Sequence, residues 1–472
     1  MKKEKGSITL FSLLALLLVT AAIFALLEGT RLQEMRRFAE LQTEVALESV
    51  FANYNACFWE NYRLLGADGL YMEEIFKRGA NGRNASGTNL LRLVPEEVQL
   101  EEYTRITDGN GSVYVASVAS YMKENFVYET AKEVYSQYQA IKQMLDKGQM
   151  DTTNITNALE EIKNFGEQKQ AKIKGKSSDA TGILETAKYW MEVGVLELVV
   201  KDIEKVSRTK VNVQEGLLER ELQKGKNPME YTNSWTERIL LQQYLLTYLS
   251  SFTDIKDNRV LSYELEYLIG KSYKDIDNLK ITVTKLLAIR EMANYLYLLS
   301  DSVRMAQVES MALFLVGATG NTILVETVKI GLLTAWALGE SILDVRALLV
   351  GKKIPLLKND RNWTLELEKM NDLSNKDFMA NTSTVGFDYE NYLGLLLLAE
   401  NEQTIAMYSM NLQELLIRKQ SADPMFCMDS LITQAKARVK YSYKPVFPFL
   451  HVIDAEKRWE YSVFAETEYG YY

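Results

Sequence analysis

Few residues of the types that carry out chemistry occur in this sequence. The chain of 472 residues has one histidine, His451, and two cysteines, Cys57 and Cys427. Most metal sites need several such side chains, and a His-dependent triad could be built only around His451. His451 itself lies in an apolar run after Phe447, a setting typical of a core or rim residue. We therefore expect no metal site and no cofactor, and a protein that is not an enzyme.

Two short motifs resemble ligand-binding loops but lack the residues that such loops need. The tripeptide GKS occurs at Gly175–Ser177 and Gly270–Ser272, yet the glycine required five residues earlier is Gln170 or Leu265. Residues 275–278 start like a calcium loop without its glycine and its late glutamate. Helix capping explains the acidic side chains better. Neither motif predicts nucleotide or calcium binding.

A polar stripe runs along an otherwise apolar helix predicted over Thr322–Leu349. At 100° per residue, its charged residues Glu326, Lys329, Glu340 and Asp344 fall within about 60° of one another. Arg346 projects from the apolar side and is expected to need a carboxylate partner. Glu340, Asp344 and Arg346 are thus a candidate buried site. The alternatives are a functional polar site and an ion pair that fixes the helix register.

Cys57 and Cys427 leave two interpretations open. An even pair permits one disulfide outside the cell, where such a bond persists. Two small buried thiols are the alternative.

The composition of the chain indicates which kinds of secondary structure position these residues. There are 54 Lys and Arg against 63 Asp and Glu, a formal net charge of −9, and 47% of residues are hydrophobic. The acidic balance argues against nucleic acid as a partner. Only six prolines occur, so long helices are not interrupted. The sequence predicts an α+β fold that is mostly helical.

The amino terminus predicts a membrane segment. No charged residue occurs from Gly6 to Leu27, and twenty helical residues span about 30 Å, the thickness of the hydrocarbon core. A cleaved secretory signal is the alternative, although its apolar region is usually shorter. Lys2, Lys3, Lys5 and the amino terminus face Arg31, Arg36 and Arg37 across this segment, so charge leans toward a cytoplasmic amino terminus. The head of six residues is too short to be a domain, which adds to this preference and places the remaining residues outside the cytoplasm.

The predicted helix continues beyond the bilayer over residues 28–56. Apolar residues at helical spacing form a stripe along it that must pack against another part of this chain or against another helix. The stripe consists of Leu32, Met35, Phe38, Leu41, Val45, Phe51 and Tyr54. The stripe is expected either to dock on the chain's own globular part or to pack on other helices of the same kind.

The start of the chain is similar to known pilus proteins. The head MKKEKG followed by SITLF resembles the class III leader of type IV pilins, which implies cleavage between Gly6 and Ser7. The longer runs GSITLFSLLALLLVTAAIFALLEGTRLQ, ALESVFANYNACFWENYRLLGADG and LLTAWALGESILDVRALLVGKKIPLLK resemble an uncharacterised bacterial family of unknown function associated with Tad (Flp-type) pilus systems. Its layout is similar to that of the TadE and TadG pseudopilin-like proteins. The resemblance implies a membrane-anchored structural component and no active site.

The rest of the chain divides into regions by pattern. Turn residues Asp108–Gly111 between two apolar runs predict a hairpin of strands. Seams over 127–145 and 183–198 predict a helical hairpin, residues 259–269 predict a strand, and Asp275–Leu299 a helix. Alternation around residues 435–443 and 459–465 predicts paired strands. The expected order is 1–6 basic leader, 7–27 transmembrane helix, 28–56 helix extension, 57–118 mixed segment, 119–252 helical hairpin region, 253–415 helical bundle core and 416–472 small β subdomain.

Together these patterns predict a single-pass protein of the cell membrane with its bulk outside the cytoplasm. The expected function is a structural or assembly component, similar to a minor pseudopilin, of a Tad-type pilus or secretion apparatus. Expected partners are membrane lipid and other pilin-like or Tad assembly proteins, with Leu32, Met35, Phe38 and Val45 as packing residues. Two alternatives remain: a membrane-tethered envelope hydrolase with paired carboxylates, and a binding or adhesion ectodomain that uses the tail tyrosines Tyr469, Tyr471 and Tyr472.

Overall fold

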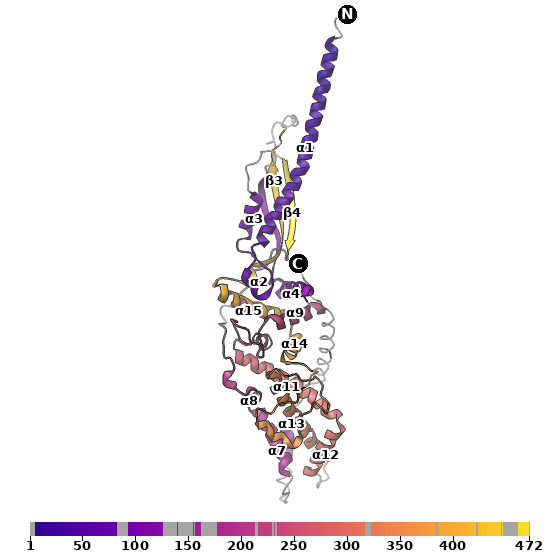
Figure 1. The fold of residues 1–472 in the computed structure, drawn as a ribbon, viewed down its shortest axis with the longest axis vertical. Coiled ribbons are helices and arrows are strands. Elements are labelled where there is room, and N and C mark those ends of the chain that lie inside the picture. Colours follow the sequence, from indigo (N-terminus) through magenta and orange to yellow (C-terminus); the bar gives the residue numbers. More distant parts are fainter. Residues whose placement is uncertain are drawn as a thin grey trace. The chain divides into compact units, whose positions relative to one another are not determined.

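The computed structural model divides the chain into two compact units (Figure 1). Unit 1 consists of residues 1–121, 220–232 and 417–472, and unit 2 of residues 122–219 and 233–416. The structure describes residues 5–82, 93–125, 139, 154, 156–161, 177–212, 216–228, 231, 234–316, 322–382, 386–421, 423–444, 446 and 461–471.

Unit 1 is built from one long helix and an antiparallel sheet. Helix α1 (Lys5–Phe51) is followed by α2 (Ala56–Tyr62), β1 (Ala67–Asp68), α3 (Met72–Asn81), β2 (Val94–Arg105) and the first part of α4 (Ser112–Asn125). The carboxyl-terminal part of the chain adds the last turn of α15 (Glu402–Ser421), β3 (Leu431–Tyr443) and β4 (Tyr461–Gly470).

The long strand β3 is the centre of the sheet. It pairs with β2 along one side, and with β1 and β4 along the other, so Val439 lies between Val98 and Ala465. The predicted pairing of the two carboxyl-terminal strands is confirmed, with Tyr441 opposite Val463. The sheet therefore joins the first hundred residues of the chain to its last forty.

The second half of α1 lies on this sheet, and the first half projects beyond it (Figure 1). One face of the helix, including Met35, Ala39, Ala46 and Val50, is buried in a core shared with β3 and α3. The helices approach closely because Gly79 of α3 has no side chain: a Cβ there would lie 2.8 Å from the Ala46 Cα atom. These small residues thus allow α1 and α3 to pack closely against each other, while both helices also contact the sheet.

Unit 2 is a bundle of helices around α13 (Thr322–Leu349). Its other elements are α7 (Ser177–Glu192), α8 (Val195–Val199), α9 (Trp235–Tyr248), α10 (Glu264–Gly270), α11 (Asp275–Ser300), α12 (Ser302–Val316), α14 (Tyr389–Ala399) and most of α15, with 3-10 turns at Ile203–Lys205, Leu217–Glu219 and Leu367–Ser374. Helices α7, α8, α11 and α12 all pack on α13. From Gly331 to Leu349 every residue of α13 is buried, as its apolar composition predicts.

The mostly helical α+β class is confirmed, and so are the helices predicted over Asp275–Leu299 and Thr322–Leu349. Two strand predictions are wrong. Residues 112–118 belong to α4, because two left-handed residues, Gly109 and Asn110, turn the chain into a helix that buries Val113 and Val118. Residues 264–270 form α10. Most of the seam predicted over 127–145 lies outside the described residues.

Candidate functional site

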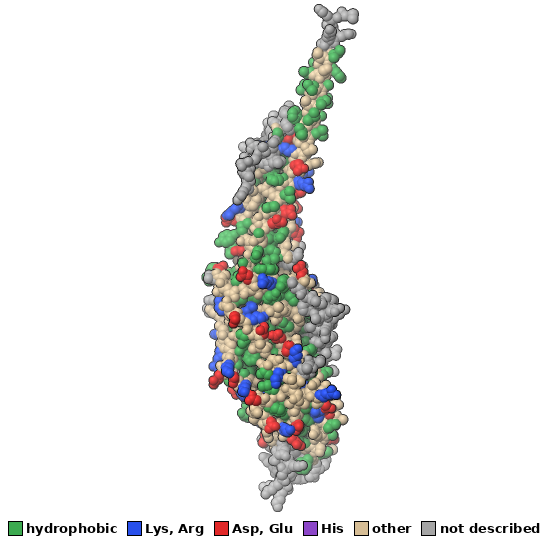
Figure 2. Space-filling model, in the orientation of Figure 1, with side chains coloured by type: hydrophobic (Ala, Val, Ile, Leu, Met, Phe, Trp, Pro, Cys, Tyr) green, Lys and Arg blue, Asp and Glu red, His purple; other side chains and the backbone are tan. Residues whose placement is uncertain are grey.

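The first half of α1 is an exposed apolar rod. The helix is continuous from Lys5 to Phe51, and its most apolar window has a mean hydropathy of 2.8 with none of it buried. Hydrophobic side chains cover this projecting part (Figure 2); Phe11 and Leu18 are more than 70% exposed. Length and composition fit a single membrane span, and a signal sequence shares both properties. Helix α13 is also long and apolar enough, but 56% of its window is buried inside unit 2.

The predicted processing residues begin this helix. Gly6 and Ser7 lie within the first turn of α1, immediately before the apolar rod. Among the described residues of α1, none before Glu28 belongs to the hydrophobic core of unit 1.

The second half of α1 carries two different apolar faces. Of the four predicted packing residues, Met35 is fully buried and Leu32 packs against the core of unit 1. Phe38 and Val45 are 44% and 58% exposed, and Leu41 beside them is also exposed. The stripe read from the sequence is therefore divided between the chain's own sheet and an outward face.

In unit 2 the structure places Glu340 and Asp344 in a completely buried charge cluster. Asp344 pairs with Arg290 of α11 at 2.9 Å and with Lys358 of the loop after α13 at 2.5 Å. Lys358 also pairs with Glu340, whose carboxylate accepts bonds from the backbone N–H groups of Thr364 and Leu365. All four charged side chains of the cluster are fully buried.

The pKa values of the two carboxyls in the cluster are shifted in opposite directions. Burial raises the pKa of Glu340; the charge of Lys358 opposes this rise and that of Asp344 adds to it. Burial would also raise the pKa of Asp344, but the positive charges of Lys358 and Arg290 outweigh it and lower that pKa. Asn294, which donates to Asp344 at 2.9 Å, completes a network in which every charge has an opposite partner. With its charged side chains fully buried, the cluster fixes how α11, α13 and the following loop pack.

Arg346 does not join this cluster. Its guanidinium donates to four backbone carbonyl oxygens, those of Leu198, Leu373, Asn375 and Phe378. Burial lowers the pKa of Arg346 to about 10, which leaves it charged at neutral pH. The expected carboxylate is therefore replaced by carbonyl dipoles, and the side chain ties α8 and the segment from Leu373 to Phe378 to α13.

Sequence reasoning missed Arg290 and Lys358. Arg290 could have been found in the same way as Arg346, as a charged residue among the apolar residues of a predicted helix, with Asn294 one turn later. Lys358 follows the helix in an irregular segment, where no periodicity indicates burial.

The two motifs that resemble binding loops have structural roles where they are described. In the second GKS tripeptide, Lys271 ends α10 in the left-handed conformation and pairs with Glu400 at 2.6 Å. The Asp275 carboxylate accepts hydrogen bonds from the backbone N–H groups of Ser262 and Tyr263 and so holds the segment that leads into α10. Gly175, Lys176 and His451 lie outside the described residues.

Both cysteines are free thiols and partly buried. The Cys57 thiol donates to the Gln420 side chain at 3.4 Å, whereas the Cys427 thiol donates to the Met425 carbonyl at 3.4 Å. The structure thus has two reduced cysteines rather than the disulfide that the sequence permits.

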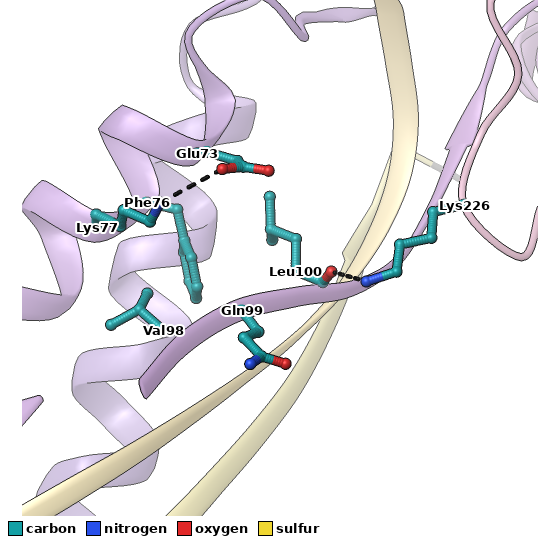
Figure 3. A pocket seen from close by; sticks show the side chains of 7 residues that line it. All are labelled: Glu73, Phe76, Lys77, Val98, Gln99, Leu100 and Lys226. Atoms are coloured by element: carbon teal, nitrogen blue, oxygen red, sulfur yellow. Dashed lines mark hydrogen bonds and ion pairs between the residues drawn. The ribbon is translucent and has the colours of Figure 1, made fainter. Parts of the chain in front are cut away.

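A small cavity lies between α3 and β2 (Figure 3). Its volume is about 270 Å³, and it is lined by Glu73, Phe76, Lys77, Val98, Gln99, Leu100 and Lys226. Lys77 pairs with Glu73 at 3.4 Å, and Lys226 donates to the Leu100 carbonyl at 3.0 Å. The lining contains a single carboxylate, so the acidic pair of a hydrolase is not found there. Nowhere in the described part of the chain do three or more His, Cys, Asp or Glu side chains form a group that could hold a metal ion.

Comparison with other proteins identifies a family. Neither the curated proteins nor the solved structures include a match. The model of a family of unknown function (DUF5702) matches residues 173–443, which is more than half of the chain and includes most of unit 2 together with β3. Helix α1 lies outside the matched residues. By this match, the chain belongs to the DUF5702 family of unknown function.

Proposed function

We propose that this protein is a membrane-anchored, extracytoplasmic structural or assembly component of a pilus or secretion apparatus, with α1 as its pilin-like anchor. The assignment to a Tad-type apparatus follows the resemblance of the sequence runs described above, at the amino terminus and over residues 332–358. The family match overlaps the later of these runs, does not include α1, and gives no function.

The observation that carries the proposal is the division of α1 into two halves. An exposed apolar half, long enough to cross a bilayer, continues without a break into a half that is seated on an antiparallel sheet. A signal sequence that is removed does not need to be continuous with a helix of the folded domain. An anchor that holds an ectodomain at a fixed position relative to the membrane does need such a continuous helix.

The outward face of α1 supports lateral packing as the mechanism. Phe38, Leu41 and Val45 fall within about 60° of one another on the helix and extend the apolar surface of the rod beyond the membrane. Outside the bilayer, burial of these exposed apolar side chains against a neighbouring helix is favourable, and inside it the rods can associate by side-chain packing. The three basic residues before Gly6 favour a cytoplasmic amino terminus, which puts both units outside the cytoplasm.

The two alternatives receive less support from the described residues. A hydrolase needs two carboxyls at a cleft, whereas Glu340 and Asp344 are fully buried and the described cavity has one carboxylate. For an adhesive tail, Tyr471 packs on Phe51 at 5.1 Å and donates to its carbonyl, so this tyrosine is docked on unit 1. Tyr472 lies outside the described residues.

Cross-linking from α1 tests the proposal directly. In a background with Cys57→Ser and Cys427→Ser, Val45→Cys places a thiol on the outward apolar face. Glu40→Cys is the matched control, because Glu40 is also exposed but projects about 140° away. In native membranes we expect Val45→Cys to form cross-links to another copy or to a second anchored protein, and Glu40→Cys to remain monomeric. Equal cross-linking at both positions, or none at either, would contradict lateral packing through this face.

A further inference from the structure

The sheet of unit 1 covers α1 from the point at which the apolar rod ends. Glu28, the residue after Leu27, is only 4% exposed, although every large hydrophobic residue from Ile8 to Leu18 is more than half exposed. Glu28 accepts a bond from Arg31 at 2.8 Å. No residue therefore acts as a linker between the rod and the folded part of unit 1.

A chain of contacts ties this point of the helix to the end of the sheet. The Arg31 guanidinium donates to the Lys444 carbonyl at 2.9 Å and lies 5.9 Å from the centre of the Tyr443 ring. The rings of Tyr443 and Tyr461, at the end of β3 and the start of β4, are 5.6 Å apart. Helix and sheet are thus fixed to each other at the boundary of the apolar rod.

Helix geometry places this layer at the surface of the bilayer. With a rise of 1.5 Å per residue, Arg31 lies about 6 Å along the axis from Leu27. The headgroup region on each side of a bilayer is about 5–7 Å thick, the difference between its full and hydrocarbon thickness. If residues 8–27 fill the hydrocarbon core, the Arg31 layer and the adjoining end of the sheet lie among the headgroups.

The residue types at this end of the sheet fit headgroups as a partner. Tyrosine is enriched at membrane interfaces because its ring is apolar and its hydroxyl is polar. Lys444 is an exposed cation at this end of the sheet. Arg36 and Arg37 are also exposed but lie farther along α1, about 14–15 Å from Leu27, and their side chains tilt toward the amino terminus and thus toward the headgroups. Basic residues beside a membrane span are attracted to anionic headgroups.

We propose that the membrane-proximal end of unit 1, where the exposed Lys444 and the partly exposed Tyr461 lie beside the buried contact of Arg31 with Tyr443, is a lipid-contacting surface that rests among phospholipid headgroups. This inference depends on the proposed anchoring by α1 and adds to it. The ectodomain stands directly on the bilayer, so the tilt of α1 and the height of the sheet are set together. Lipid phosphate is the ligand class that the cations would bind.

A depth measurement on the full chain tests this surface. The protein, with Cys57→Ser and Cys427→Ser, is reconstituted in vesicles of phosphatidylethanolamine and phosphatidylglycerol and labelled with a fluorophore at one introduced cysteine. Lys444→Cys reports the proposed surface. Glu468→Cys is the matched control, because it is exposed on the same sheet but lies seven residues along β4 from Tyr461, about 23 Å away. Leu18→Cys reports the rod.

Quenching by lipids that carry a spin label on the headgroup gives distinct outcomes. We expect most of the fluorescence at Lys444→Cys to be lost and little at Glu468→Cys, with Leu18→Cys quenched by a label on the acyl chain. If Leu18→Cys is quenched by the acyl-chain label but Lys444→Cys responds no more than Glu468→Cys, the headgroup contact is refuted while the anchor stands. If Leu18→Cys is not quenched by the acyl-chain label, the proposed anchoring itself fails.

Discussion

Removing Lys358 should show how strongly unit 2 depends on its buried charges. The substitution Lys358→Met deletes the ammonium that pairs with both Glu340 and Asp344 and leaves two buried carboxyls beside each other. Breaking a buried pair in this way costs about 3–5 kcal/mol of unfolding free energy. The exposed neighbour Lys353→Met is the control, and a change within about 0.5 kcal/mol is expected there.

A second substitution separates the charge from the packing. In the double variant Lys358→Met with Glu340→Gln, the amide oxygen can still accept the bond from the Leu365 N–H group, but no unpaired charge remains at that position. We expect the double variant to be more stable than the single one, with a coupling of about 1–3 kcal/mol. The single variant should also lose stability as the pH rises, because Glu340 without its cation is held protonated in the folded state.

Urea titrations of the detergent-solubilised chain provide the assay. Lys358 Nζ lies 5.8 Å from the Trp363 ring, and the Trp336 and Trp363 rings are 5.7 Å apart, so tryptophan fluorescence follows this part of unit 2. Linear extrapolation gives the free energies. A cost below about 1 kcal/mol for Lys358→Met, or a double variant no more stable than the single one, would refute the role assigned to the cluster.

Three further predictions concern both units. Burial raises the pKa values of Glu264 and Glu266 from 4.5 to about 7. Their contribution to stability is therefore complete below pH 4.5 and is lost as the pH rises through about 7. In urea titrations, Glu266→Gln should reduce the dependence of the unfolding free energy on pH, and an unchanged dependence would contradict the role of this buried carboxyl. Gly79→Ala should destabilise unit 1 by about 1–2 kcal/mol, because overpacking against Ala46 exceeds the gain in helix propensity. Gly29→Ala, whose added methyl group meets no atom within 4 Å, is the control in thermal unfolding. Stabilisation by Gly79→Ala would contradict the close packing of α1 on α3. Alkylation of the unfolded, unreduced chain should label both Cys57 and Cys427, and labelling that requires a reductant would show that they are bridged.

Sequence patterns predict the elements whose environment is uniform along their length. The rod of α1 is apolar throughout, and α13 is buried almost all round, so composition and period alone define them. The strand β2 is different, because its partner β3 lies far along the chain. The turn at Asp108–Gly111 suggested a local hairpin, but the following residues pair with no strand and form α4 instead.

For the candidate sites, the sequence likewise indicates some of the residues but not the partners that they contact. Glu340 and Asp344 stand out as charges on an apolar helix, and the structure buries both. Their partners come from α11 and from an irregular loop, and sequence distance contains no information on such contacts. The stripe on α1 shows the same limit: spacing indicates which residues are apolar, whereas only the docked sheet determines that Met35 is buried and Val45 is exposed.

The intact mass of the protein recovered from alkaline-washed membranes tests the central claim most directly. We expect the chain to stay in the membrane pellet with a mass that includes residues 8–27, and with its amino terminus at Ser7 where the leader is cleaved after Gly6. A chain that begins beyond Leu27 and is released by the wash would show that the rod is a removed signal. The anchor, and the pilus role built on it, would then be contradicted.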